Sequence, residues 1–82
     1  MLNAEIYVTL KKTVADPQGL TIKHALHSLG HKEAKEVRMG KLVKITLDIK
    51  DKKQAEKELE GMCRKLLANP IIEEYSFVIK EE

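Results

Sequence analysis

Three histidines are the side chains best suited to metal chemistry in this sequence. His24 and His27 are three residues apart, so in a helix they occupy neighbouring positions of one surface, and His31 follows closely. A histidine pair needs a further ligand and an orienting carboxylate to hold a metal ion, yet no acidic residue occurs between Pro17 and Lys32. The pattern therefore favours polar histidines bordering an apolar face, without a bound metal.

The single cysteine, Cys63, is the other side chain that could act as a nucleophile or ligand. It belongs to an apolar stripe with Leu59 and Met62, where a thiol packs as a small hydrophobic group. A nucleophilic cysteine needs a base and an electropositive setting, and the sequence offers neither. One cysteine forms no internal disulfide, which fits a reducing cytosol. We therefore expect no catalytic, cofactor-binding or metal-binding residues.

Length, composition and charge narrow the class of protein. The 82 residues suffice for one domain (1–82) with a core so small that oligomerisation is favoured. The formal net charge of +2 is not typical of nucleic-acid-binding proteins. No apolar run approaches the ~20 residues of a membrane helix, and the N-terminus lacks signal-peptide features. We expect a soluble cytoplasmic protein with neither nucleic-acid nor membrane partners.

Hydrophobic periodicity predicts six elements in the order βαββαβ. Strands are expected over 4–10, 34–39, 42–50 and 71–79, and the first helix over 17–29. A second helix is expected between a cap at Asp51 and a stop at Asn69-Pro70, with Leu66 and Leu67 on its apolar side. Gly40-Lys41 is expected to form a tight hairpin turn.

These elements predict an α+β class, as a two-layer ferredoxin-like fold. In this fold both helices cover one face of a four-stranded antiparallel sheet. Right-handed connections would place the first and third strands at the centre and the second and fourth at the edges.

The segment from Asp16 to Gly30 carries signals for both ends of a helix. Asp16 is an N-cap candidate, Pro17 suits the first helical position, and Gly30 suits a left-handed exit. Gly19 in the first turn costs about 1 kcal/mol relative to alanine, so close approach of another backbone is expected there. Apolar residues at helical spacing should face a partner layer. They are Ile22, Ala25, Leu26 and Leu29.

This architecture occurs in proteins of several functions, and the sequence lacks the residues that some of those functions require. A metal chaperone would need Cys-x-x-Cys in the loop over 11–16, and an acylphosphatase-like site would need an arginine and a glycine-rich cradle there. That loop contains neither. An RNA-recognition module would stack bases on aromatic side chains of the central strands, where only Tyr7 is available.

Four segments in series resemble the PurS family, and together they span essentially the whole chain. They are Asp16-Pro17-Gln18-Gly19, His24-Ala25-Leu26-His27-Ser28-Leu29-Gly30, Val37-Arg38-Met39-Gly40-Lys41 and Met62-Cys63-Arg64-Lys65-Leu66-Leu67-Ala68-Asn69-Pro70-Ile71-Ile72-Glu73.

The resemblance implies a non-catalytic role in a multi-subunit ligase. PurS is the small subunit of phosphoribosylformylglycinamidine synthase, which converts formylglycinamide ribonucleotide to formylglycinamidine ribonucleotide in purine biosynthesis. The implied partners are the synthetase subunit PurL and the glutaminase subunit PurQ, which PurS would bridge while helping ammonia to pass between them. The complex would use ATP, magnesium and glutamine, with no cofactor bound by this chain.

Interface candidates are drawn from the first helix and from the predicted edge strands. A homodimer is expected through an edge strand, and Arg38 and Lys41 are expected to make charged contacts to a larger subunit. The full set is Asp16, Gln18, Gly19, His24, His27, Arg38, Gly40 and Lys41.

Two other classes of function stay open at this point. A small-molecule-sensing domain of the ACT type shares the βαββαβ order, and its effector would raise its stability. A nucleic-acid module would bind in a salt-dependent way, which the near-neutral charge disfavours.

Overall fold

The computed structural model describes residues 1–81, which form an α+β fold with two helices and an antiparallel sheet. The sheet has three strands in the order β2-β1-β3, so the first strand is central as predicted. The α+β class and the antiparallel sheet are therefore confirmed. In chain order the elements are β1 (Leu2–Leu10), α1 (Pro17–Ser28), β2 (Gly40–Leu47), α2 (Lys52–Met62), the π-helix η1 (Cys63–Leu67) and β3 (Glu73–Glu81).

The segment 34–39 forms no strand within the described residues, contrary to the prediction. The backbone N–H of Met39 donates to the Asp16 carboxylate, which ties the segment to the start of α1. Gly40 and Lys41 lie inside β2, opposite Thr9 and Val8, so the predicted hairpin turn is wrong. As a result β2 is an edge strand, although the third predicted strand was expected at the centre.

The hydrophobic core lies between one face of the sheet and α2. Alternate residues of β1 point into it, and Ile6, Leu59 and Cys63 have no exposed surface. Burial raises the pKa of the Cys63 thiol, with a smaller contribution from the nearby Glu60 carboxylate. The prediction that Cys63 packs as a small hydrophobic residue is confirmed.

The second helix changes its winding before it ends. Asp51 caps α2 by accepting from the Lys53 backbone N–H. From Cys63 onward the helix continues as η1, in which the Ala68 N–H donates to the Cys63 carbonyl five residues back. The wider turn rotates the side chains, and Leu66 is 82% exposed, so its predicted place on the apolar side is wrong.

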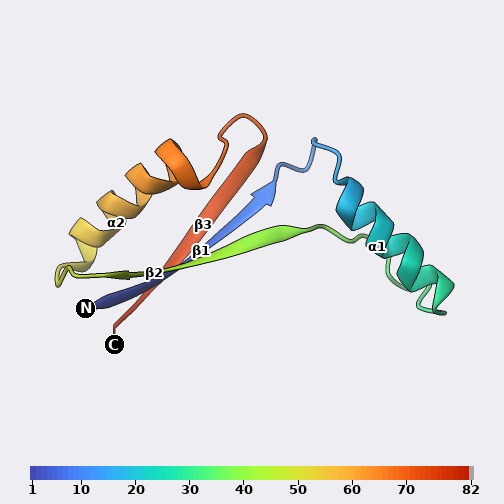
Figure 1. Cartoon of the computed structure of the whole chain (residues 1–82), viewed down its shortest axis with the longest axis horizontal. Helices are drawn as coiled ribbons and strands as arrows, with labels where there is room; N and C mark the ends of the chain where they lie inside the picture. The colour runs from blue at the N-terminus through green and yellow to red at the C-terminus, as the bar shows by residue number, and fades with distance from the viewer. Residues whose placement is uncertain (82) are drawn as a thin grey trace.

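Helix α1 lies beyond one end of the sheet and does not cover its face (Figure 1). The radius of gyration is 16.1 Å, whereas a compact domain of this length has about 12 Å. The extents of 49 × 28 × 14 Å reflect the same elongated shape. The predicted packing of both helices on the sheet therefore holds for α2 alone in this chain.

The ends of α1 follow the sequence signals. Asp16 is the N-cap and Pro17 is the first helical residue. At the other end Gly30 has φ +100°, the His31 N–H donates to the Leu26 carbonyl, and the Gly30 N–H donates to the His27 carbonyl. These two bonds form a Schellman motif, which confirms the predicted left-handed exit.

Candidate interaction surface

The Asp16 carboxylate joins the start of α1 to the segment that precedes β2. Its Oδ1 accepts from the Gly19 N–H at 3.0 Å, as an N-cap does, and its Oδ2 accepts from the Met39 N–H at 2.6 Å. Among residues 1–81, Asp16 is the one charged residue that is buried. The bond from Met39, then that from Gly19, holds the pKa of Asp16 below its ordinary range, and the nearby Arg38 charge acts in the same direction.

The lowered pKa of Asp16 predicts loss of stability in acid. Because the folded-state pKa lies below the unfolded-state value of about 4, the carboxylate stabilises the fold at neutral pH. That contribution is lost as pH falls through the folded-state pKa. Asp16→Asn does not titrate and places an amide N–H2 where an acceptor is needed. We expect its unfolding midpoint to be several degrees below wild type at neutral pH and to draw closer to wild type as the pH falls below the unfolded-state value of about 4. Thermal unfolding across this range measures the gap, and a constant gap would contradict the role of the charge.

Gly19 packs directly against the backbone of the same segment. A Cβ at this position would collide with the Val37 carbonyl oxygen and lie 2.9 Å from Asp16 Oδ2. Close approach of another backbone was expected from the sequence, and the structure identifies that backbone as the chain's own. Gly19 is buried, so its first role is inside the molecule.

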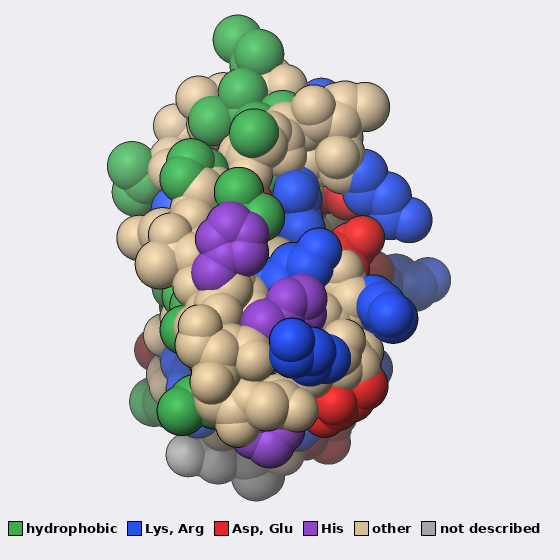
Figure 2. All heavy atoms as spheres, turned by 90° about the vertical axis from the view of Figure 1, so that its right-hand side faces the viewer, with side chains coloured by type: hydrophobic (Ala, Val, Ile, Leu, Met, Phe, Trp, Pro, Cys, Tyr) green, Lys and Arg blue, Asp and Glu red, His purple; other side chains and the backbone are tan. Residues whose placement is uncertain are grey.

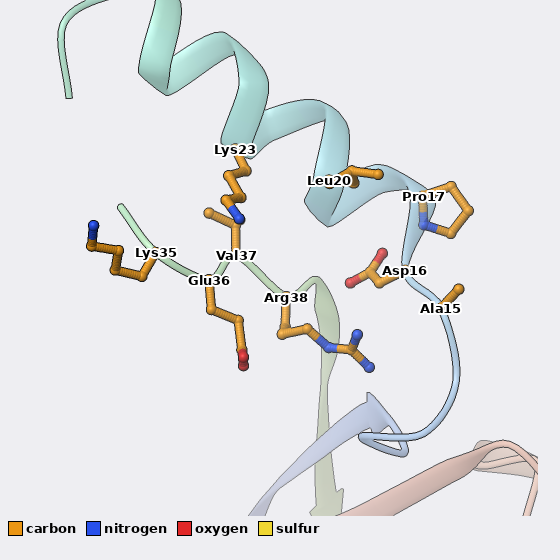
Figure 3. Close-up of a pocket in the computed structure, with 9 residues that line it drawn as sticks. All are labelled: Ala15, Asp16, Pro17, Leu20, Lys23, Lys35, Glu36, Val37 and Arg38. Carbon is orange, nitrogen blue, oxygen red and sulfur yellow. The ribbon is translucent and has the colours of Figure 1, made fainter. Parts of the chain in front are cut away.

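Arg38 is likewise used inside the chain. Its Nη2 donates to the carbonyl of Lys11 at 3.0 Å and to that of Val14 at 2.9 Å. Both acceptors belong to the loop between β1 and α1. Figure 3 shows the Asp16 carboxylate pointing from the end of this loop toward the segment that carries Arg38, and both residues line a cavity of about 400 Å³ between α1 and residues 35–38.

Gln18, Gly40 and Lys41 gather around a second hollow beside Asp16. This hollow has a volume of about 270 Å³ and lies where the sheet meets the start of α1. Lys41 Nζ is 3.9 Å from a carboxylate oxygen of Glu73 on the far edge strand, β3. The structure therefore brings together six of the eight candidate residues near one end of the sheet: Asp16, Gln18, Gly19, Arg38, Gly40 and Lys41.

The two helical histidines lie apart from this cluster and differ from one another. His27 is half-buried, and its Nε2 is 2.8 Å from the Ala34 carbonyl oxygen, which ties α1 to the segment that follows it. His24 is exposed. Within residues 1–81, no group of three His, Cys, Asp or Glu side chains is placed to hold a metal ion.

The outer stripe of α1, formed by Ile22, Ala25 and Leu29, is exposed rather than packed on the sheet. Ile22 is 36% exposed and Leu29 75%. Ile22 also borders an apolar hollow of about 420 Å³ with Pro17, Gln18, Thr21 and Met39. Figure 2 views this end of the molecule, with hydrophobic side chains mostly at the top and left, Lys and Arg side chains mostly at the right, and His side chains between them.

Sequence reasoning missed the groups that complete the junction. They are the Val37 carbonyl, the Met39 N–H and the carbonyls of Lys11 and Val14. All are backbone atoms, which carry no residue-specific signal. Of the groups at the junction, the sequence pattern pointed to Asp16, Gly19 and Arg38.

Comparison with known proteins identifies the family. The family model described as PurS, phosphoribosylformylglycinamidine (FGAM) synthase, matches residues 3–81. The PurS subunit of Bacillus subtilis is 41% identical over 81 residues, covering 99% of this chain and 95% of that protein. The PurS subunit of Archaeoglobus fulgidus is 44% identical over 78 residues, covering 95% of this chain and 98% of that protein.

Solved structures agree with the sequence relatives. The crystal structure of Methanocaldococcus jannaschii PurS, one of the subunits of formylglycinamide ribonucleotide amidotransferase, superposes with a TM-score of 0.90 at 38% identity and covers 100% of this chain and 99% of that one. A chain in the structure of PurLQS from Thermotoga maritima gives a TM-score of 0.86 at 28% identity, covering 98% and 99%. In the described part of the chain, no helix is both long and apolar enough to cross a membrane. The match along nearly the full length, in sequence and in fold, shows that this chain belongs to the PurS family of phosphoribosylformylglycinamidine synthase subunits.

Proposed function

We propose that this chain is the non-catalytic assembly subunit of a cytoplasmic phosphoribosylformylglycinamidine synthase. In this role it bridges the synthetase subunit PurL and the glutaminase subunit PurQ and helps ammonia to pass between them. The observation that carries the proposal is the full-length match to PurS subunits, including the chain from the PurLQS structure. ATP, magnesium and glutamine are bound by the larger subunits in this proposal, and this chain binds none of them. The family match favours this role over the ACT-like sensing domain.

Reconstitution with the two larger subunits tests the assembly role. Purified PurL and PurQ are mixed with ATP, magnesium, glutamine and formylglycinamide ribonucleotide, with and without this chain. We expect formylglycinamidine ribonucleotide to form at a substantial rate only when this chain is present. An equal rate in its absence would contradict the proposal.

A homodimer is the second part of the proposal, and the placement of α1 supports it. A chain of 82 residues has a small core, and here α1 leaves its outer stripe in water. The elongated shape indicates that the chain is not closed around one core. We propose that a second copy covers the outer stripe of each α1 across a two-fold interface. In the same proposal, residues 34–39 gain their strand partner from the second copy, which completes a four-stranded sheet.

A charge placed in the outer stripe should separate the copies. Ile22→Asp puts a carboxylate into the proposed interface, and we expect it to convert a dimer into a monomer in sedimentation velocity. Leu42→Asp is the matched control. Leu42 is 49% exposed and lies on the face of the sheet that points away from the core, so this substitution should leave the dimer intact. A monomeric wild type, or dissociation by the control alone, would contradict a dimer through α1.

A further inference from the structure

The loop between β1 and α1 accepts hydrogen bonds from two adjacent residues of the segment before β2. Arg38 donates from its side chain to the carbonyls of Lys11 and Val14, at 3.0 and 2.9 Å. Met39 donates from its backbone to the Asp16 carboxylate at 2.6 Å. We call these five residues the clasp. They close a ring of contacts between two segments that are more than twenty residues apart in sequence.

The position of the clasp matters because α1 starts immediately after it. Pro17, the first residue of the helix, follows Asp16 directly. The helix projects away from the sheet at this point (Figure 1). The contact of Gly19 with Val37 adds a second fixed point one turn later. The direction of α1 relative to the sheet is thus determined where the clasp closes.

We propose that Arg38 is a positioning residue whose hydrogen bonds fix the direction of α1 and thereby present its outer stripe to a second copy. This inference rests on the homodimer proposed above. The expectation from the sequence that Arg38 contacts a larger subunit through its charge stays a separate proposal. The Nη2 group donates to two carbonyl oxygens at once, so its hydrogen bonds are made within the chain.

The chemistry of arginine distinguishes the two roles. A contact made through charge alone would be retained by Arg38→Lys, since lysine carries the same charge. The clasp needs a donor at the end of a long planar group, and lysine is shorter with a differently shaped, strongly hydrated head. Lys35, on the same segment, provides the matched control: it is exposed and takes part in none of the clasp bonds.

The test uses the full chain as wild type, Arg38→Lys, Arg38→Ala and Lys35→Ala. Amide exchange at Met39 reports whether the clasp is closed. A nitroxide attached at Ser28→Cys, at the far end of α1, reports the direction of the helix through the sheet amides that it broadens. The native Cys63 is buried and has a raised pKa, so the label goes to the introduced cysteine. Sedimentation measures self-association.

We expect both Arg38 variants to exchange the Met39 amide at least tenfold faster, to change the set of broadened amides, and to weaken self-association at least tenfold. Lys35→Ala should match wild type in all three measurements. Thermal unfolding should show that the core under α2 persists in every variant. Wild-type behaviour of Arg38→Lys together with weakened association of Arg38→Ala would overturn the proposal in favour of a charge contact.

The two proposals fail in different ways. A monomeric wild type would show that the homodimer is wrong, and the exchange and broadening data would still decide whether Arg38 fixes α1. If Arg38→Ala leaves Met39 exchange and the broadened amides unchanged, the positioning role is wrong whatever the oligomeric state.

Discussion

Gly19→Ala is expected to destabilise the chain, although glycine-to-alanine changes inside helices usually stabilise. The added methyl group would collide with the Val37 carbonyl oxygen, which belongs to the backbone and cannot rotate away as a side chain would. Overpacking of this kind costs about 1–3 kcal/mol. The contact also holds α1 against the clasp, so the substitution should loosen self-association too. Urea unfolding gives the change in the free energy of unfolding.

Gly61→Ala is the matched control for this prediction. Gly61 lies near the end of α2, and a Cβ there would meet no atom within 4 Å. We expect the free energy of unfolding to rise by about 0.5–1 kcal/mol, the usual gain for glycine to alanine in a helix. Equal gains at positions 19 and 61 would show that Val37 does not approach Gly19 in solution.

Leu59→Ala is expected to have the largest effect on the core. Leu59 has no exposed surface and packs from α2 against the residues of β1. Removing most of a fully buried leucine side chain costs about 2–5 kcal/mol, because both transfer free energy and packing contacts are lost. For a small domain this is a large share of a total stability of about 5–15 kcal/mol. The midpoint of chemical unfolding should fall sharply.

The effect of Leu66→Ala on stability distinguishes the π-helical winding of η1 from a regular α-helix. In an unbroken α-helix Leu66 would follow Leu59 by two turns and share its buried face. In the structure it is 82% exposed, so its truncation should change the free energy of unfolding by no more than about 0.5 kcal/mol. A loss comparable with that of Leu59→Ala would contradict the winding over Cys63–Leu67.

The parts of the fold that sequence predicted are those encoded by neighbouring residues. The caps at Asp16 and Asp51, the exit at Gly30 and the alternation along β1 all depend on side chains within a few positions of one another. Burial of Cys63 followed from its place in the apolar stripe of the second helix. These local signals predicted both helices, three of the four expected strands and the α+β class.

The parts that sequence did not predict depend on distant backbone contacts. The alternation over 34–39 resembled a strand, but Met39 donates to Asp16 instead of to a neighbouring strand. The π-helical turn of η1 is marked by the hydrogen bond from the Ala68 N–H to the Cys63 carbonyl, and no side-chain pattern in the sequence predicts it. The apolar stripe of α1 is exposed in this chain, and its burial by a second copy stays a proposal, because periodicity does not say whether the partner belongs to the same chain.

The sequence predicted which residues gather at the candidate surface, but not the contacts that they make within the chain. Asp16, Gly19 and Arg38 do lie together, but each makes its contacts inside the chain. His27 lies against the Ala34 carbonyl, and this contact gives a structural reason for its place on α1. Contacts of all eight candidate residues with partner subunits remain proposals. A sequence pattern marks special backbone positions without showing which backbone approaches them.

In the function that we propose, this chain allows glutamine-derived ammonia to reach the synthetase subunit. The most direct measurement compares formylglycinamidine ribonucleotide synthesis with glutamine and with ammonium chloride as the nitrogen source, in PurL–PurQ mixtures with and without this chain. We expect the chain to raise the glutamine-dependent rate strongly and to leave the ammonia-dependent rate nearly unchanged. An equal effect on both rates, or none on either, would contradict the account.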